Sequence, residues 1–360
     1  MLNKKNVLIA LVTLFVVLAG AVYFSFCCKP DFTLEEPVVF EVKNPPHIGK
    51  GFYLGGFSDL FYKNNHLYAI TDRGPNTNIK NLENRDIRNF PLGKDYKPFL
   101  IEFELQNDGI AKISKLSNFS ISGLPVSEAR DCVPCDMQDK EMPFDPYGSD
   151  TESLAIDKNG HFWVGDEYFP SIIEFDQNLN VVNRFATINS PYANKGITCN
   201  LPEIFNKVQK NLGFESIAYD GNNHIYAFTQ GSLSKGTFVK IVKFNIETKT
   251  PENVYSYYIG AGKNIISAAT FISENEILTA ERRNGEHQIR VLKLKPFIVN
   301  TSEKVLSLKG LNGIQNGQKI EGIAFDGNDK VYVINDNDFG IDDENRKDSF
   351  IMEFKLVRKN

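Results

Sequence analysis

A pattern of short apolar runs repeats along this 360-residue chain, and carboxylate side chains recur at two positions of the repeat. One set opens a series of short apolar runs: Glu152, Glu215 and Glu321, with Phe57 and Ser267 at the matching places of two further runs. A second set ends the apolar run that follows each of these: Asp72, Asp166-Glu167, Gln230, Glu281 and Asp336. Carboxylates that converge on one place need a counter-charge. A hard divalent cation, most readily calcium, would supply it through oxygen ligands.

Basic side chains are an alternative partner for the same carboxylates. They are Arg73, Arg130, Arg282, Arg283 and Lys319. An acidic residue at the start of a strand can also accept hydrogen bonds from loop amides. Each carboxylate taken alone therefore has a structural interpretation, whereas the recurrence of the whole set favours a metal or ligand site.

Short strands are the elements that must position these residues. The first run of each copy leads into a turn such as Lys158-Asn159-Gly160, whose residue types are typical of a β-hairpin. A second run rich in β-branched and aromatic residues follows, and then a third with alternating apolar residues, as in 99–105. Five copies are readable, with no convincing helix between them. We predict an all-β β-propeller with five readable blades, or with a sixth, degenerate blade inside the long first interval.

The predicted blades place both acidic sets on one rim. In an up-and-down blade, the start of the first strand and the end of the second share a face, and the first strand is innermost. The long segments 74–98, 123–150, 188–213 and 337–349 rise from the same rim, where function is usually found on rigid scaffolds. Segment 37–42 is predicted to supply the missing outer strand of the last blade and so to close the ring.

Other catalytic classes find little support. His66, His161 and His224 share one repeat position just after the first turn, where Glu276 and Lys330 also occur, so we interpret them as structural. The sequence has no Gly-x-Ser-x-Gly motif, and we predict no histidine on the acidic rim. A serine hydrolase is therefore poorly supported. The net charge of −5 argues against nucleic acid as a partner, because phosphate backbones require a basic surface.

The N-terminus has the pattern of a targeting segment. Lys4 and Lys5 precede an uncharged, largely apolar run at residues 7–28, which is long enough to span a bilayer. We favour an uncleaved membrane anchor over a cleaved signal peptide, with a lipidated cysteine at Cys27 or Cys28 as a third interpretation. The charge asymmetry orients the remainder away from the cytoplasm. The predicted divisions are the targeting segment at 1–30, a linker with the ring-closing strand at 31–47, and the propeller domain at 48–360.

Three cysteines lie beyond the targeting segment: Cys132, Cys135 and Cys199. In an exported protein a structural disulfide is the first interpretation. The Cys-x-x-Cys spacing also fits a redox motif or half of a zinc site.

Several motifs resemble the phytase-like family described as having "esterase-like activity of phytase". They are Asp72-Arg73-Gly74-Pro75-Asn76, Ala129-Arg130-Asp131-Cys132, Asp150-Thr151-Glu152-Ser153, Gly165-Asp166-Glu167-Tyr168, Gly213-Phe214-Glu215-Ser216, Ala280-Glu281-Arg282 and Glu321-Gly322-Ile323-Ala324 with Asn335-Asp336-Asn337-Asp338. The resemblance covers residues 48–356 and implies an exported bacterial propeller, periplasmic or on the cell surface. Phe169, where glycine is expected, and Gln230, which interrupts the acidic series, depart from the pattern.

The resemblance implies phosphoester hydrolysis by the recurring acidic residues. Together with the cation expected at the acidic rim, this makes a calcium-dependent hydrolase of a small phosphorylated or ester substrate the leading hypothesis. The expected catalytic residues are Glu215, Glu321, Arg73 and Arg282. The expected metal ligands are Asp72, Glu152, Asp166, Glu167, Glu281 and Asp336. Arg130 and Lys319 are expected to bind phosphate. Two other functions fit the sequence: an envelope-anchored binding propeller without turnover, and a metal-dependent lactonase or sugar-ester hydrolase. Oligomeric state is left open.

Overall fold

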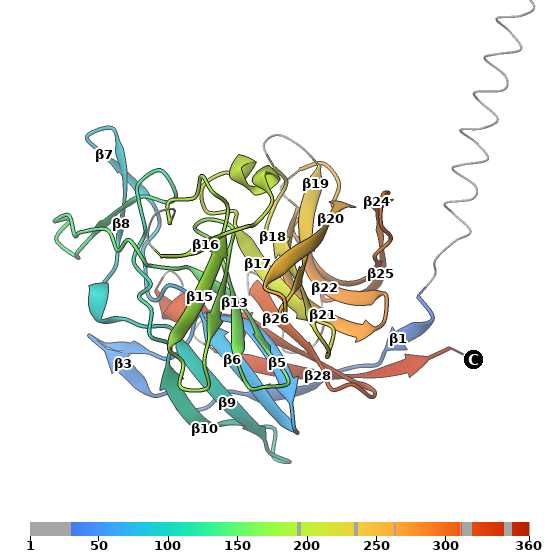
Figure 1. Cartoon of the computed structure of the whole chain (residues 1–360). Coiled ribbons are helices and arrows are strands. Elements are labelled where there is room, and N and C mark those ends of the chain that lie inside the picture. The colour runs from blue at the N-terminus through green and yellow to red at the C-terminus, as the bar shows by residue number, and fades with distance from the viewer. Residues whose placement is uncertain are drawn as a thin grey trace, which may run out of the picture.

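The computed structural model describes residues 30–192, 196–233, 237–262, 264–309, 311, 319–341 and 348–359. Within these residues the protein is a β-propeller, as predicted, built from sheets that are antiparallel except for the short edge strands β16 and β24 (Figure 1). The sheets consist of β5 (Phe57–Lys63), β6 (His66–Thr71), β9 (Phe99–Leu105) and β10 (Ala111–Asn118); β12 (Thr151–Ile156), β13 (Phe162–Asp166), β14 (Ser171–Phe175), β15 (Val181–Ala186) and β16 (Thr198–Cys199); β17 (Phe214–Tyr219), β18 (His224–Thr229), β19 (Phe238–Asn245), β20 (Thr250–Tyr258) and β24 (Val299–Asn300); β21 (Ile265–Ser273), β22 (Glu276–Arg283), β23 (Glu286–Lys293) and β25 (Ser302–Ser307); and β26 (Lys319–Phe325), β27 (Lys330–Asp336) and β28 (Phe350–Arg358).

The first strands of these sheets surround a common axis. They contact one another in the order β5, β12, β17, β21 and β26, and β26 contacts β5 in turn. One buried apolar cluster lies between each neighbouring pair of sheets, so each sheet covers its faces with its two neighbours. The rigid wall that results fixes the ends of the inner strands around the axis.

The chain ends close the last sheet. β1 (Phe32–Leu34) and β2 (Val38–Glu41) both pair antiparallel with β28, so an N-terminal segment supplies the outer strand beside a C-terminal one. The predicted closure by segment 37–42 is confirmed, and β1 extends it. The backbone N–H of Lys359 also donates a hydrogen bond to the carbonyl of Asp31 at 2.7 Å.

The long interval between the first two copies of the repeat forms smaller elements of its own. In the part of the chain that the structure describes, this interval forms the three-stranded sheet β7 (Lys80–Leu82), β8 (Arg85–Asn89) and β11 (Val133–Cys135), which has fewer strands than the four- and five-stranded sheets of the blades. Three short 3₁₀ turns and the hairpin of the remaining two strands complete the described elements: η1 (Gly93–Asp95), η2 (Glu203–Lys207), η3 (Asp338–Gly340), β3 (His47–Gly49) and β4 (Phe52–Tyr53).

The predicted disulfide is wrong for this structure, because all three described cysteines are free. Cys132 and Cys135 are buried beside and within β11, and Cys199 is exposed on β16. Residues three positions apart on an extended segment point to opposite faces with Cα atoms about 10 Å apart, beyond the reach of a disulfide. The Cys132 thiol instead donates to Asp131 Oδ2 at 3.0 Å.

The membrane prediction falls on residues 7–28, which lie outside the described residues. No helix in the described ranges is both long and apolar enough to cross a bilayer.

Asp59 joins three sheets near the axis. Its carboxylate accepts from the backbone N–H groups of Leu60 and Leu154, both at 2.8 Å, and from that of Ile323. These donors belong to β5, β12 and β26, three of the inner strands. Burial raises the pKa of Asp59 well above its usual range, and the three donors oppose that rise. Asp59 therefore connects the first sheet to both of its neighbours.

We predict that Asp59→Ala lowers the free energy of unfolding by about 2–4 kcal/mol, because three buried N–H groups lose their acceptor. Urea denaturation measures the change. Asp108→Ala, in the exposed turn between β9 and β10, is the matched control and should leave stability unchanged. Equal stability of the two variants would contradict this role.

Candidate functional site

A β-bulge at the start of each inner strand forms the first layer of the site. The register with the second strand skips one residue at the same place in all five sheets. The skipped residues are Ser58, Glu152, Glu215, Ser267 and Glu321. In the first copy the bulged position is therefore Ser58, one residue after the predicted Phe57, because Phe57 pairs regularly with Thr71. A bulge re-aims a side chain that regular pairing would direct elsewhere.

The ends of the second strands form a second layer. The residues that follow or end these strands at the matching place are Asp72, Glu167, Gln230, Arg282 and Asp336, and all five line one cavity of about 630 Å³. Ser58, Glu152, Glu215 and Glu321 of the first layer line it too. The predicted convergence of the two sets is therefore what the fold produces.

Two predicted ligands lie one residue away from this layer and point into the sheets. Asp166 accepts from Arg184 at 2.6 Å and from Tyr192 at 2.5 Å. Glu281 is fully buried and accepts from Arg283 at 2.6 Å and Tyr257 at 2.5 Å. Successive residues of a strand face opposite sides, so only one of each adjacent pair reaches the cavity.

The basic residues divide between the cavity and its surroundings. Arg73, Arg282 and Lys319 line the cavity, while the Arg130 guanidinium lies over the Phe169 ring, 4.3 Å from its centroid, and does not line the cavity. Arg282 donates to Glu321 at 3.0 Å, and Lys319 pairs with Asp336 at 3.4 Å and with Asp338 at 2.5 Å. Arg130 is thus set apart from Lys319, the other residue that the sequence assigned to phosphate.

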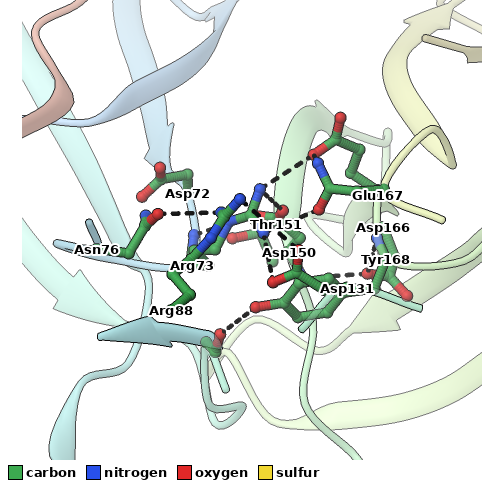
Figure 2. Close-up of polar contacts among 12 residues, drawn as sticks. Asp72, Arg73, Asn76, Arg88, Asp131, Asp150, Thr151, Asp166, Glu167 and Tyr168 are labelled. Carbon is green, nitrogen blue, oxygen red and sulfur yellow. Dashed lines mark hydrogen bonds and ion pairs between the residues drawn. The ribbon is translucent and has the colours of Figure 1, made fainter. Parts of the chain in front are cut away.

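Arg73 is held by three carboxylates (Figure 2). Its guanidinium is 2.5 Å from Asp150 Oδ2, 3.3 Å from Glu167 Oε2 and 3.3 Å from Asp131 Oδ2. Asn211 accepts a further hydrogen bond from it at 2.8 Å. The side chain is buried and forms ion pairs with all three carboxylates, so Arg73 acts here as an internal counter-ion.

Asp150, Glu152 and Glu167 form the strongest candidate cation site. One oxygen from each lies within 4.8 Å of the other two. Glu167 is 3% exposed, and its Oε1 is buried without a hydrogen-bond partner. Glu321 Oε2, elsewhere in the same cavity, is also buried and unpartnered. Free carboxylate oxygens in a buried polar cavity fit a hard cation such as calcium.

Sequence reasoning did not select several residues of the site: Asn76, Arg88, Asn211 and Asp338, which line the cavity, and Asp150, which belongs to the candidate cation cluster. Asp150 lies two residues before Glu152, and Asn76 lies four residues after Asp72 in the same motif. Their closeness in sequence to predicted site residues could have identified both as candidates. Arg88 comes from β8, and it lines the cavity while donating to Asn76 at 3.0 Å. Only the folding of the β7–β8 hairpin over the rim brings Arg88 to the cavity.

Electrostatic repulsion dominates the cavity. Seven carboxylates line it against four basic side chains. Burial and the neighbouring carboxylates raise the pKa values of Asp72, Glu152, Glu167 and Glu215 well above their usual range. Burial also raises the pKa of Asp336 to about 7, although Lys319 opposes the shift. The site without a cation therefore favours protonated carboxyls.

The comparisons with known proteins decide the family. The chain belongs to the phytase-like family. The match, described as "esterase-like activity of phytase", spans residues 53–339, and the sequence-based prediction of the family is confirmed. A search of curated proteins finds no match.

Three solved structures resemble the chain at low identity. A luciferin-regenerating enzyme is 10% identical with a TM-score of 0.41, covering 89% of this chain and 95% of its own. The PQQ-bound aldose sugar dehydrogenase of Streptomyces coelicolor is 10% identical with a TM-score of 0.40, covering 90% of this chain and 100% of its own. The Cps50 (Swd1) β-propeller domain of Myceliophteria thermophila is 9% identical with a TM-score of 0.31, covering 51% of this chain and 49% of its own. Function is therefore inferred from the family and from the cavity itself.

We predict that Arg73→Met destabilises the calcium-free protein by about 3–5 kcal/mol, because three buried carboxylates lose their counter-ion. Calcium should then raise the melting temperature of the variant more than that of the wild type, since the cation replaces the lost charge. Differential scanning fluorimetry with calcium and with chelator measures both effects.

Arg85→Met is the control, since Arg85 forms exposed ion pairs with Glu128 and Glu141 on the same insertion. If Arg73→Met kept full calcium-free stability and lost only substrate affinity, Arg73 would contact the substrate as one of the catalytic residues that the sequence suggested, and its role as a counter-ion would be wrong.

A pH dependence of stability follows from the raised pKa values. A carboxyl whose folded pKa exceeds its unfolded value contributes stability that is present below the unfolded pKa and is lost as pH rises through the folded one. For Asp336 this window lies between its ordinary value of 3.8 and about 7. In chelator, the free energy of unfolding should therefore increase as the pH falls from about 8 toward about 5. Saturating calcium should reduce this gain, and a flat profile in chelator would contradict the prediction.

Proposed function

We propose that this chain is a calcium-dependent hydrolase that cleaves phosphoesters in the acidic cavity. Membership of a family described by esterase-like activity supports hydrolysis. The observation that carries the proposal is the buried set of Asp150, Glu152 and Glu167, with Glu167 Oε1 left unpartnered. Such a set is costly to retain unless it binds a cation.

The charge of the cavity supports the dependence on metal. Seven carboxylates against four basic groups would repel an anionic phosphoester. A bound divalent cation supplies positive charge that polarises the substrate oxygen and lowers the pKa of a bound water. Asp150, Glu152 and Glu167 would hold it, with Asp72 and Asp336 also facing the cavity. Substrate binding is therefore expected only when the cation is present.

The contacts of the remaining residues suggest the role of each in binding the substrate or transferring a proton. Arg282 binds Glu321 and its side chain is 32% exposed, so it can reach a substrate oxygen. The unpartnered Oε2 of Glu321 can accept a proton from an attacking water. Glu215 accepts from Gln230 at 3.1 Å, and the raised pKa of its carboxyl suits it to hold or release a proton. Lys319, held by Asp336 and Asp338, adds positive charge to the same wall.

A metal-dependent lactonase or sugar-ester hydrolase is the second candidate. The excess of carboxylates favours it, because a neutral ester can enter an acidic cavity without the repulsion that a phosphate meets. A binding propeller without turnover is the outcome if neither substrate class is cleaved.

We predict that Glu321→Gln and Glu215→Gln each lower hydrolysis by about 10²–10⁴-fold while the fold is retained, because an amide cannot take up the proton. Phosphate release from phytate and from simple phosphomonoesters and diesters is measured with calcium and with chelator. Glu353→Gln is the control, since Glu353 pairs with Lys330 outside this cavity.

The outcomes separate the candidates. Calcium-dependent phosphate release lost in both variants supports the phosphoesterase. Full activity in both variants sinks the assignment of these glutamates. Cleavage of neutral lactones without phosphate release selects the second candidate, and neither reaction from a folded, calcium-binding protein selects the binding propeller.

A further inference from the structure

The loop between β23 and β25 presents a group of exposed apolar side chains. Phe297 is 99% exposed, and Ile298 and Val299 beside it are also exposed. Phe238 and Tyr258, whose ring centroids are 5.7 Å apart, are exposed at the paired ends of β19 and β20 in the neighbouring sheet. Consecutive exposed aromatic and aliphatic side chains on one loop, such as Phe297, Ile298 and Val299, can mark an interaction site.

Asn300 builds the loop from within. It is 2% exposed, and its Oδ1 accepts from the backbone N–H of Lys295 at 2.7 Å. Its Nδ2 donates to the carbonyls of Lys295, Ser256 and Ile298 at 3.2–3.3 Å. The same loop pairs with β20 through β24. The loop is therefore an organised structure that holds its apolar tip outward.

Phe297 adopts an unusual backbone conformation at this tip. Its φ is 62°, in the left-handed region that bulky side chains rarely occupy. Such a conformation persists only where the surroundings enforce it, and it is then often part of a function. Here the Asn300 hydrogen bonds enforce it, and the result is a phenylalanine ring with almost no protein contact.

The position of the loop relative to the N-terminus selects its partner. The Lys293 Nζ lies 3.6 Å from Asp31 Oδ2, and β1 contacts β25. Figure 1 places β24, β25 and β1 on the same side of the propeller. Phe297 is four residues beyond Lys293, so their Cα atoms are at most about 14 Å apart. The apolar run at residues 7–28 ends three residues before Asp31. A membrane anchor in that run would hold this side of the propeller at the bilayer surface.

We propose that the loop of Lys295–Asn300 is a second membrane contact, which inserts Phe297 and Ile298 into the lipid interface beside the N-terminal anchor. Aromatic and aliphatic side chains suit the boundary between head groups and acyl chains, and the exposed Lys295 suits the head groups. Two contacts fix the orientation of the propeller on the membrane, which a single point of attachment does not do. The inference is independent of the reaction proposed for the cavity.

The test uses the full chain in vesicles of phosphatidylcholine and phosphatidylglycerol with brominated acyl chains. Trp163, the single tryptophan, is fully buried and supplies a constant background. Phe297→Trp and Ile298→Trp each add one reporter in the loop. Val182→Trp, at an exposed apolar position on the outer strand β15 of another sheet, is the matched control.

In both loop variants the added emission should shift to the blue and lose most of its intensity to brominated lipid, while the control should remain unquenched. Unquenched emission from both loop variants in membrane-bound protein would overturn the proposal. A blue shift that depends on protein concentration and not on bromine would also overturn it, because the loop would then contact a second copy of the chain. Circular dichroism confirms that the variants retain the fold.

Discussion

Repulsion among buried carboxylates is the constraint on which the rest of the site depends. Asp72, Glu152, Glu167, Glu215 and Asp336 face one cavity, and burial with mutual repulsion raises the pKa of each. A fold that brings these groups together gives up stability unless something offsets their charge. Arg73, Arg282 and Lys319 offset part of it from within the protein. A cation would offset the rest, and this links metal binding, protonation and stability in one site.

The propeller produces the convergence through a repeated local feature. Each inner strand carries a β-bulge at its start, and the bulged position is glutamate in three sheets and serine in two. Each second strand adds one side chain from its end. The residue just before that end turns into the sheet, where Asp166 and Glu281 are held by arginine and tyrosine. A site on such a scaffold is rigid, because apolar clusters between the sheets fix the strands that carry it.

The inserted segment between the first two repeats, which contains β7, β8 and β11, completes the site. β8 brings Arg88 to the cavity, and the segment just before β11 supplies Asp131 to Arg73. Gly213 shows how closely the loops approach, since a Cβ there would lie 2.3 Å from the carbonyl oxygen of Asp166. Its N–H donates to the carbonyl of Glu167 at 2.8 Å and so fixes the backbone of that residue. Only glycine allows the two blades to meet this closely beside the candidate cation site.

The repeated pattern by itself determined the all-β propeller, the closure by residues 37–42 and the single acidic rim, because strand periodicity and turn residues are local properties of the chain. It also identified the family through short motifs that stand in order. Period-two alternation left open which of Asp166 and Glu167 reaches the cavity, and which of Glu281 and Arg282 does. The choice depends on the register set by the β-bulge at the start of the neighbouring inner strand. It also misplaced the cysteines, because extended backbone at β11 separates Cys132 from Cys135. The role of Arg73 was decided only by the tertiary structure. Its partners Asp131, Asp150 and Glu167 lie 58 to 94 residues away, and no local pattern reports which charges will meet across that distance.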